Sequence, residues 1–205
     1  MAKLTVTTFL TLDGIMQAPG GPPEDTSGGF EHGGWLVPHF DAELGQFMTQ
    51  IFERADAFLL GRGTYQIFAG HWPRMTDPHD PIATRLNQLP KHVASRTLAQ
   101  ATWNNSTLVR DAAAEVGELK RRYSRELQVH GSAGLAQTLL QHDLVDELNL
   151  MFFPLVLGVG KRLFGPGTVP TSLELQSSRA TTQGVTMTTY HRKGRPQYGS
   201  FMLEP

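Results

Sequence analysis

The segment Ala57-Phe58-Leu59-Leu60-Gly61-Arg62-Gly63-Thr64-Tyr65 joins a short apolar run to a turn that contains two glycines. A short apolar run that ends in glycine indicates a strand covered by helices on both faces. A glycine turn directly after such a strand is typical of a helix start, where unpaired backbone N–H groups and the positive end of the helix dipole can bind a phosphate. The segment therefore predicts a strand, a turn and a helix with an anion site between them.

A second unit of the same kind follows later in the chain. Residues 127–130 predict a strand, Gly131-Ser132-Ala133-Gly134 predicts a turn, and Leu135, Leu139 and Leu140 lie in the helix behind it. Neither turn matches the dinucleotide fingerprint G-x-G-x-x-G or a Walker motif. Taken singly, each turn could serve only to reverse the chain tightly. Their occurrence together after two buried strands favours a shared phosphate site.

Strands and helices are predicted to alternate along most of the chain. Apolar and alternating patterns indicate strands over 3–11, 57–60, 92–94, 106–110, 127–130 and 147–155. Helices are expected after the capping residues Asp41, Asp80 and Asp111. The helix after Asp41 has one apolar face, made of Leu44, Phe47, Met48, Ile51 and Ala55. Residues 184–193 and 196–203 predict a closing antiparallel hairpin. The order predicts one α/β domain over residues 1–205, with a mostly parallel sheet between helices.

The segment 12–34 contains seven glycines and three prolines and predicts a long connection without regular structure. Such loops inside a compact domain are usually functional or disordered.

The composition argues against several classes of function. A formal net charge of -1, with basic residues spread along the chain, argues against nucleic-acid binding. The chain has no cysteine, which excludes disulfides and thiolate metal sites and suits a reducing compartment. The most apolar run, 148–157, is shorter than the roughly 20 residues that cross a bilayer as a helix, and the N-terminus lacks the order of a signal peptide. We therefore expect a cytoplasmic protein with a small-molecule substrate and no membrane or nucleic-acid partner.

Several short motifs occur in an order that resembles the dihydrofolate reductase superfamily. They are Thr11-Leu12-Asp13-Gly14, Gly61-Arg62-Gly63-Thr64-Tyr65, Ser95-Arg96-Thr97-Leu98, Gly131-Ser132-Ala133-Gly134-Leu135, Leu144-Val145-Asp146-Glu147-Leu148 and residues 154–164. Within that superfamily the chain is most similar to the reductase domain of the riboflavin-biosynthesis deaminase/reductase and its stand-alone homologues. The resemblance implies a three-layer dihydrofolate reductase-like fold and a nicotinamide-dependent reductase. It also makes a homodimer plausible.

The resemblance implies a divided NADPH site. Arg62 and Thr64, within the turn Gly61 to Thr64, would meet the cofactor phosphates, and Gly131 to Leu135 would bind the pyrophosphate. Ser95 and Arg96, with Thr97 beside them, would bind the ribose 2′-phosphate. Because arginine binds phosphate through two parallel hydrogen bonds, Arg62 and Arg96 favour NADPH over NADH.

The resemblance leaves the substrate open. In dihydrofolate reductases a carboxylate on the helix after the glycine-rich loop holds the pterin, and the corresponding position here lies near Gly45, where there is no acid. Folate reduction is therefore not expected. The segment 12–34 has no basic cluster for a ribose phosphate, which weakens the assignment to 5-amino-6-(5-phosphoribosylamino)uracil reduction.

Three residues are candidates for the substrate half of the site. Asp13, in the turn after the first strand, could contact the substrate or donate a proton, or could simply bond its own backbone. Trp35 and Phe47 could wall a flat heterocycle, although Phe47 also suits the core. The reaction would deliver a hydride to a C=N or C=O group, which needs few catalytic side chains.

Other functions fit the sequence less well. The turn around Ser132 is not the G-x-S-x-G motif of a hydrolase. The eight histidines show no metal-ligand spacing. A binding module that holds NADPH or another ligand without turnover remains an alternative, since a fold does not fix a function.

Overall fold

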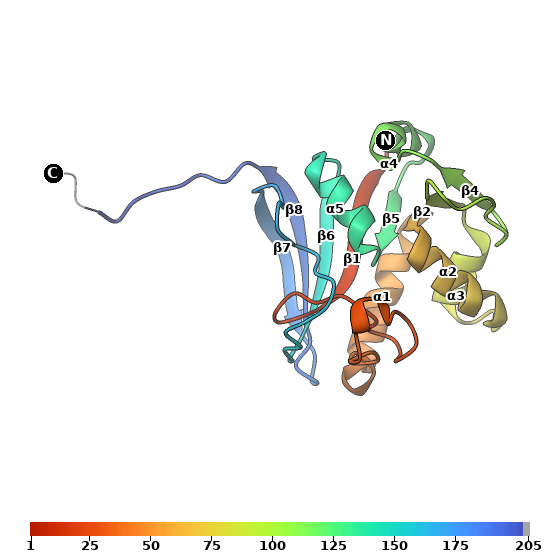
Figure 1. Ribbon diagram of the computed structural model, residues 1–205, viewed down its shortest axis with the longest axis horizontal. Helices are drawn as coiled ribbons and strands as arrows, with labels where there is room; N and C mark the ends of the chain where they lie inside the picture. Colours follow the sequence, from red (N-terminus) through yellow and green to blue (C-terminus); the bar gives the residue numbers. More distant parts are fainter. Residues whose placement is uncertain (203–205) are drawn as a thin grey trace.

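One eight-stranded sheet forms the centre of the protein, as seen in a computed structural model that describes residues 1–202 (Figure 1). The strand order is β4-β3-β2-β5-β1-β6-β8-β7. The strands are β1 (Lys3–Thr11), β2 (Ala55–Gly61), β3 (Lys91–Ala94), β4 (Ser106–Val109), β5 (Glu126–His130), β6 (Glu147–Phe153), β7 (Ser172–Ala180) and β8 (Thr186–Gly194). The strands β1 to β6 pair in parallel, and β8 pairs antiparallel with both β6 and β7. The predicted α/β class with a mostly parallel sheet is confirmed.

Five α-helices cover the two faces of this sheet. They are α1 (Ala42–Glu53), α2 (Arg62–His71), α3 (Pro81–Gln88), α4 (Ala112–Arg122) and α5 (Ala133–Gln141). Short 3₁₀ turns lie at Ser27–Gly29, Val37–His39 and Trp72–Arg74. Helices α1 and α3 pack into one apolar cluster with Phe58 and Met151, and α4 and α5 pack into a second cluster with Leu4 and Leu127. The central strands β1, β2, β5 and β6 are therefore buried on both faces, which explains the apolar runs of β2 and β6.

The chain changes direction along the sheet beside β1. From β1 it passes over to β2 and continues outward to β3 and β4, then returns as β5 between β2 and β1, before β6 adds on the other side of β1. In open α/β sheets, a crevice forms outside the carboxyl ends of the strands at such a point and is the usual place for a ligand. The loops that follow β1, β2, β3 and β5 meet there.

The helix caps confirm the sequence prediction. The carboxylates of Asp41, Asp80 and Asp111 accept hydrogen bonds from backbone N–H groups in the first turns of α1, α3 and α4. Ala55 was predicted to lie on the apolar face of the helix after Asp41, and this was wrong. Helix α1 stops at Glu53, and Ala55 is the first residue of β2.

The closing hairpin exists, but its strands differ from the prediction. The segment 184–193 corresponds to β8, whereas its partner is β7 and not the predicted 196–203. Residues 196–202 form no strand, and residue 203 lies outside the described part. Strand β7 is a polar edge strand exposed along most of its length, and its sequence has only a brief apolar alternation, at Leu173 and Leu175.

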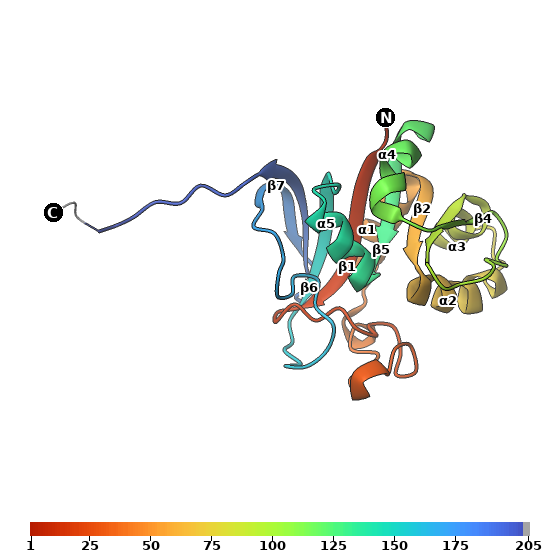
Figure 2. The same cartoon turned by 45° about the horizontal axis from the view of Figure 1, so that its top comes forward.

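The glycine-rich segment 12–34 is folded against the sheet rather than loose (Figure 2). Ile15, Gln17 and Phe30 are buried, and Ile15 forms an antiparallel bridge with Arg162 from the loop after β6. The side chain of Gln17 joins three backbone groups, since its amide donates to Asp25 O and Ser27 O and accepts from Lys161 N–H. This segment thus forms one wall of the crevice.

Candidate functional site

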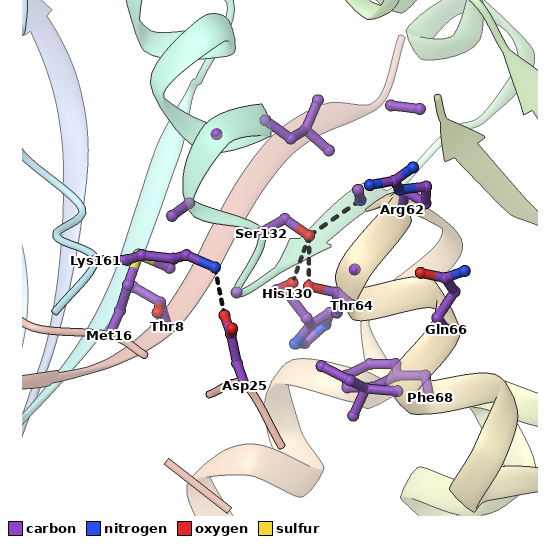
Figure 3. Close-up of a pocket in the computed structure, with 18 of the residues that line it drawn as sticks. Thr8, Met16, Asp25, Arg62, Thr64, Gln66, Phe68, His130, Ser132 and Lys161 are labelled. Carbon is purple, nitrogen blue, oxygen red and sulfur yellow. Dashed lines mark hydrogen bonds and ion pairs between the residues drawn. The ribbon is translucent and has the colours of Figure 1, made fainter. Parts of the chain in front are cut away.

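A cavity of about 1150 Å³ opens at the carboxyl ends of β1, β2, β3 and β5. Both glycine turns line it, as do the ends of β3 and the glycine-rich segment (Figure 3). The residues predicted from sequence to bind the cofactor and found in its wall are Gly61, Arg62, Gly63, Thr64, Ser95, Arg96, Gly131, Ser132, Ala133, Gly134 and Leu135. The structure therefore brings together in one cavity three motifs that are separated in the sequence.

The two glycine turns touch each other. Gly61 N–H donates to Ser132 Oγ at 3.0 Å, and Ser132 Oγ in turn donates to Thr64 Oγ1 at 2.9 Å. Gly131 and Ser132 both have positive φ, of 55° and 58°, which turns the chain sharply into α5. A Cβ on Gly61 would lie 3.2 Å from Ser132 Cβ and Oγ, so glycine is needed for this close approach.

The helices that follow these turns start without side-chain caps. Neither Gly61, before α2, nor Ser132, before α5, supplies a capping hydrogen bond, whereas aspartates cap α1, α3 and α4. Free N–H groups and the helix dipole favour an anion at both starts. Because both starts face one cavity, their free N–H groups suit a ligand with more than one phosphate.

Three arginines surround the end of β3 in the same cavity. Arg62 Nη1 donates to Thr97 Oγ1 at 2.9 Å, so its guanidinium is held beside the Ser95–Leu98 turn. Arg110, which the sequence did not single out, donates to the carbonyls of Ser95 and Leu98 at 2.9 and 2.8 Å. Arg96 is exposed in the cavity wall. Thr97 does not line the cavity and contributes by holding Arg62.

Asp13 lies outside the cavity, contrary to the prediction of a substrate contact. Its carboxylate accepts hydrogen bonds from Thr11 Oγ1 at 2.5 Å and from the backbone N–H groups of Leu157 and Gly158 at 3.2 and 2.8 Å. Burial raises the pKa of Asp13, but these hydrogen bonds outweigh burial and leave the pKa below its usual value. Through these hydrogen bonds the Asp13 carboxylate ties the turn after β1 to the loop after β6.

Trp35 and Phe47, which were predicted to wall a heterocycle, are buried and are not among the residues that line the cavity. The Trp35 indole donates to Gln17 O at 2.8 Å and packs edge-on against Phe153. Phe47 is buried in the core under the Arg179 guanidinium of β7. Helix α1 presents Met48 and Phe52 to the cavity instead.

The cavity wall opposite the glycine turns comes from residues that the sequence reading missed. Asp25 pairs with Lys161 at 2.5 Å across the mouth, joining the glycine-rich segment to the loop after β6 (Figure 3). Burial raises the pKa of Glu24, and the hydrogen bond from Gly20 N–H offsets this only in part. Burial raises the pKa of Asp25 too, but hydrogen bonds from Lys161 and Ser27 lower it further than burial raises it. These residues lie in a loop without periodicity, so only their proximity in space reveals them.

His130, the last residue of β5, also lines the cavity and was missed. Its ring is stacked on Phe52, with centroids 4.3 Å apart, and its Nε2 lies 3.0 Å from Gln128 Oε1. Burial lowers the pKa of His130 to about 3, so the imidazole is neutral at physiological pH.

Two kinds of feature are absent from residues 1–202. This part of the chain contains no group of three or more His, Cys, Asp or Glu arranged to hold a metal ion. It also contains no helix long and apolar enough to cross a membrane.

Comparison with known proteins identifies relatives that match over most of the chain. YyaP of Bacillus subtilis, an uncharacterized protein, is 28% identical over 195 residues, which cover 94% of this chain and 96% of YyaP. A crystal structure of a protein from Shewanella sp. PV-4 assigned to riboflavin biosynthesis matches with a TM-score of 0.70 and 26% identity, over 94% of this chain and 99% of that one.

Two more distant structures share the fold. A pyrimidine reductase-like protein from Corynebacterium diphtheriae has a TM-score of 0.62 at 13% identity and covers 94% of this chain and 92% of its own. Acinetobacter baumannii RibD has a TM-score of 0.63 at 13% identity and covers 94% of this chain, which matches 58% of that protein.

The family model named RibD C-terminal domain matches residues 2–187. This match confirms the resemblance to the riboflavin-biosynthesis reductases that the sequence motifs suggested, and the chain therefore belongs to the RibD C-terminal domain family.

Proposed function

We propose that the protein is an NADPH-dependent reductase that transfers a hydride to a C=N or C=O group of a small heterocyclic or sugar-derived substrate. One observation carries this proposal: the two glycine turns meet in a single large cavity, in a chain of the RibD C-terminal domain family. A reductase of a pyrimidine related to riboflavin biosynthesis is the nearest specific activity, and the family membership supports it.

The residues of the cavity fit a dinucleotide phosphate. The uncapped starts of α2 and α5 supply backbone N–H groups for the pyrophosphate. Gly61 has no side chain that would separate the two turns. Arg62, Arg96 and Arg110 provide cations at the end of β3 for a further phosphate on the ribose. NADPH would supply the hydride, and the protein would supply orientation and electrostatics.

The remainder of the cavity suits a flat, neutral ring. Met48, Phe52 and Phe68 line it with apolar surface, and apolar walls with a few polar groups are typical of small-molecule sites. Glu24, also in the wall, has a pKa above its usual value, because burial outweighs the backbone hydrogen bonds to its carboxyl group. Glu24 Oε2 accepts from Gly20 N–H at 2.6 Å.

Titration calorimetry with NADPH and NADH, followed by turnover assays, tests this proposal. We expect NADPH to bind at least about tenfold more tightly than NADH, a difference of about 1.4 kcal/mol. A panel of pterins, aminopyrimidine ribosides and dicarbonyls should then include a compound that consumes NADPH. Failure to bind NADPH contradicts the proposal, and binding without any turnover favours a non-catalytic binding module.

A further inference from the structure

A chain of polar side chains runs along β5 beneath α1 and ends in the cavity. Glu126, Gln128 and His130 alternate along this strand and so share one face of the sheet. Arg54 Nε donates to Glu126 Oε1 at 2.6 Å, and Gln128 links Glu126 to His130. Buried polar groups held in this way are expected to have a single arrangement of their hydrogens.

The orientation of the Gln128 amide follows from its partners. Its Nε2 donates to Ile51 O at 2.7 Å and to Glu126 Oε2 at 2.7 Å, and both of these atoms can only accept. A flipped amide would place Oε1 against two acceptors. Oε1 therefore points at His130 Nε2, 3.0 Å away, and can only accept from it, so Nε2 carries the ring proton.

This arrangement leaves Nδ1 of His130 without a proton. Phe52 stacks on the ring and Phe58 packs at 5.7 Å, and burial among them lowers the pKa of His130 to about 3. Nδ1 has no hydrogen-bond partner within residues 1–202, and it is not one of the fully buried unpaired atoms of that region. His130 is one of the residues that line the cavity (Figure 3), so Nδ1 lies at the cavity wall.

A second unpaired polar group lies on the neighbouring strand. Thr7 of β1 is the register partner of His130 and also lines the cavity. In the described part of the chain its buried Oγ1 has no hydrogen-bond partner. A buried polar atom without a partner is costly unless a ligand or water satisfies it. Because Thr7 Oγ1 is enclosed, the polar group that this part of the cavity presents to a ligand is the acceptor at His130.

We infer that His130 is a specificity-determining residue that accepts a hydrogen bond through Nδ1 from a ring N–H of the substrate. A ring N–H, as in the lactam group of a pyrimidine or pteridine, satisfies His130 Nδ1. A ring that lacks the N–H leaves Nδ1 unpaired, and buried groups left unpaired give strong discrimination between close analogues. Gln128 acts through His130 and is a positioning residue. The inference rests on the proposed function for the identity of the site as a substrate pocket.

Two pteridines that differ only in their N–H groups provide the test. Lumazine and 1,3-dimethyllumazine are titrated by fluorescence, with and without NADPH, into the wild type and into His130→Phe and His92→Phe. His92 is a matched control, because it is also buried, has a pKa lowered by burial and pairs through Nε2 with Tyr123 OH, yet does not line the cavity. We expect the wild type and His92→Phe to prefer lumazine by at least about tenfold, and His130→Phe to lose this preference. NADPH affinity should stay within about twofold in all three proteins.

Nitrogen NMR of the wild type tests the tautomer without any variant. The His130 ring should carry hydrogen at Nε2 and not at Nδ1 throughout about pH 5 to 8, and Gln128→Met should release this constraint. A proton on Nδ1, or a wild type that binds neither compound or both equally, overturns the inference. If His130→Phe does not fold, His130→Gln replaces it, and any retained preference must then be weaker than in the wild type. Absence of NADPH binding contradicts the proposed function alone, because the NMR result and the lumazine preference are measured without NADPH.

Discussion

The backbone N–H of Gly61 donates a hydrogen bond to the hydroxyl of Ser132, 71 positions away in the chain, at 3.0 Å. This bond joins the turn after β2 to the turn after β5 and fixes the spacing of the two helix starts that face the cavity. Five predictions follow from this site and from the contacts that hold its walls.

Gly61→Ala should weaken NADPH binding by at least about tenfold, because the new Cβ pushes Ser132 away and separates the two turns. Calorimetric titration measures this change. Gly70→Ala, in the exposed part of α2 with open space around it, is the control and should stabilise the helix by up to about 1 kcal/mol without changing affinity. Equal affinities for both variants and the wild type would show that the contact does not shape the site.

Two replacements of Ser132 distinguish the contribution of its hydroxyl to stability from the cost of its left-handed backbone. Ser132→Ala keeps a side chain at a φ of 58° and removes the bond to Gly61, so unfolding in urea should show a loss of about 1 to 2 kcal/mol. Ser132→Gly removes the same bond but relieves the left-handed backbone by about 1 kcal/mol, and should be nearly as stable as the wild type. The reverse order of stabilities would contradict this account.

Arg96→Gln should lower NADPH affinity by about ten- to a hundredfold and leave NADH affinity unchanged, because a charged hydrogen bond to the 2′-phosphate contributes about 1.5 to 3 kcal/mol. Competitive titration of the two cofactors measures the ratio. Arg74→Gln removes an exposed arginine outside the cavity and should change neither affinity. A parallel loss of NADH binding would mean that Arg96 does not recognise the 2′-phosphate.

Asp13→Ala should loosen the loop after β6 rather than abolish a proton-transfer step. The N–H groups of Leu157 and Gly158 lose their acceptor, so their amide hydrogen exchange should accelerate by at least about tenfold, a change of about 1.4 kcal/mol in local opening. Asp13→Asn keeps one acceptor oxygen and should give a smaller change. Unchanged exchange in Asp13→Ala would contradict the structural role.

The ion pair of Asp56 with Arg125 should make stability depend on acidic pH. Burial raises the pKa of Asp56, but hydrogen bonds from the Arg125 side chain and from two backbone N–H groups lower it to about 2. A carboxyl group whose pKa is lower in the folded than in the unfolded state stabilises the folded state at pH values above the unfolded pKa. This contribution disappears as pH falls from about 4 to 2.

Asp56→Asn should therefore cost about 1 kcal/mol at pH 7, after allowance for solvent screening, and progressively less below about pH 4. Urea unfolding across this range measures it. Glu118→Gln, which breaks the exposed pair with Arg122 on α4, serves as the control and should cause no measurable change. A cost for Asp56→Asn that is constant with pH would show that ionisation of Asp56 does not contribute.

Much of the architecture could be predicted because its signals are local. The apolar run before Gly61 is a strand because both its faces are covered, and Asp41, Asp80 and Asp111 cap helices through bonds that span only two or three residues. The two glycine turns that line the cavity were predictable for the same reason, since each consists of consecutive residues between a buried strand and a helix.

The substrate half depends on contacts between distant residues. Trp35 and Phe47 have suitable side chains, but they pack against Phe153 and Arg179, respectively. The carboxylate of Asp13 accepts hydrogen bonds from the backbone of Leu157 and Gly158. The role inferred for His130 needs the Gln128 amide and the α1 carbonyl of Ile51, which only packing brings together.

By itself, then, the sequence determined the alternating α/β order and the two helix starts that can bind phosphate, because hydrophobic periodicity and turn chemistry act over a few residues. Tertiary structure decided that Ser132 contacts Gly61, that His130 and Glu24 share the same cavity and that Asp13 lies outside it. The direction of a side chain and the environment that shifts its pKa are set by neighbours from other strands and loops, and no local pattern records those neighbours.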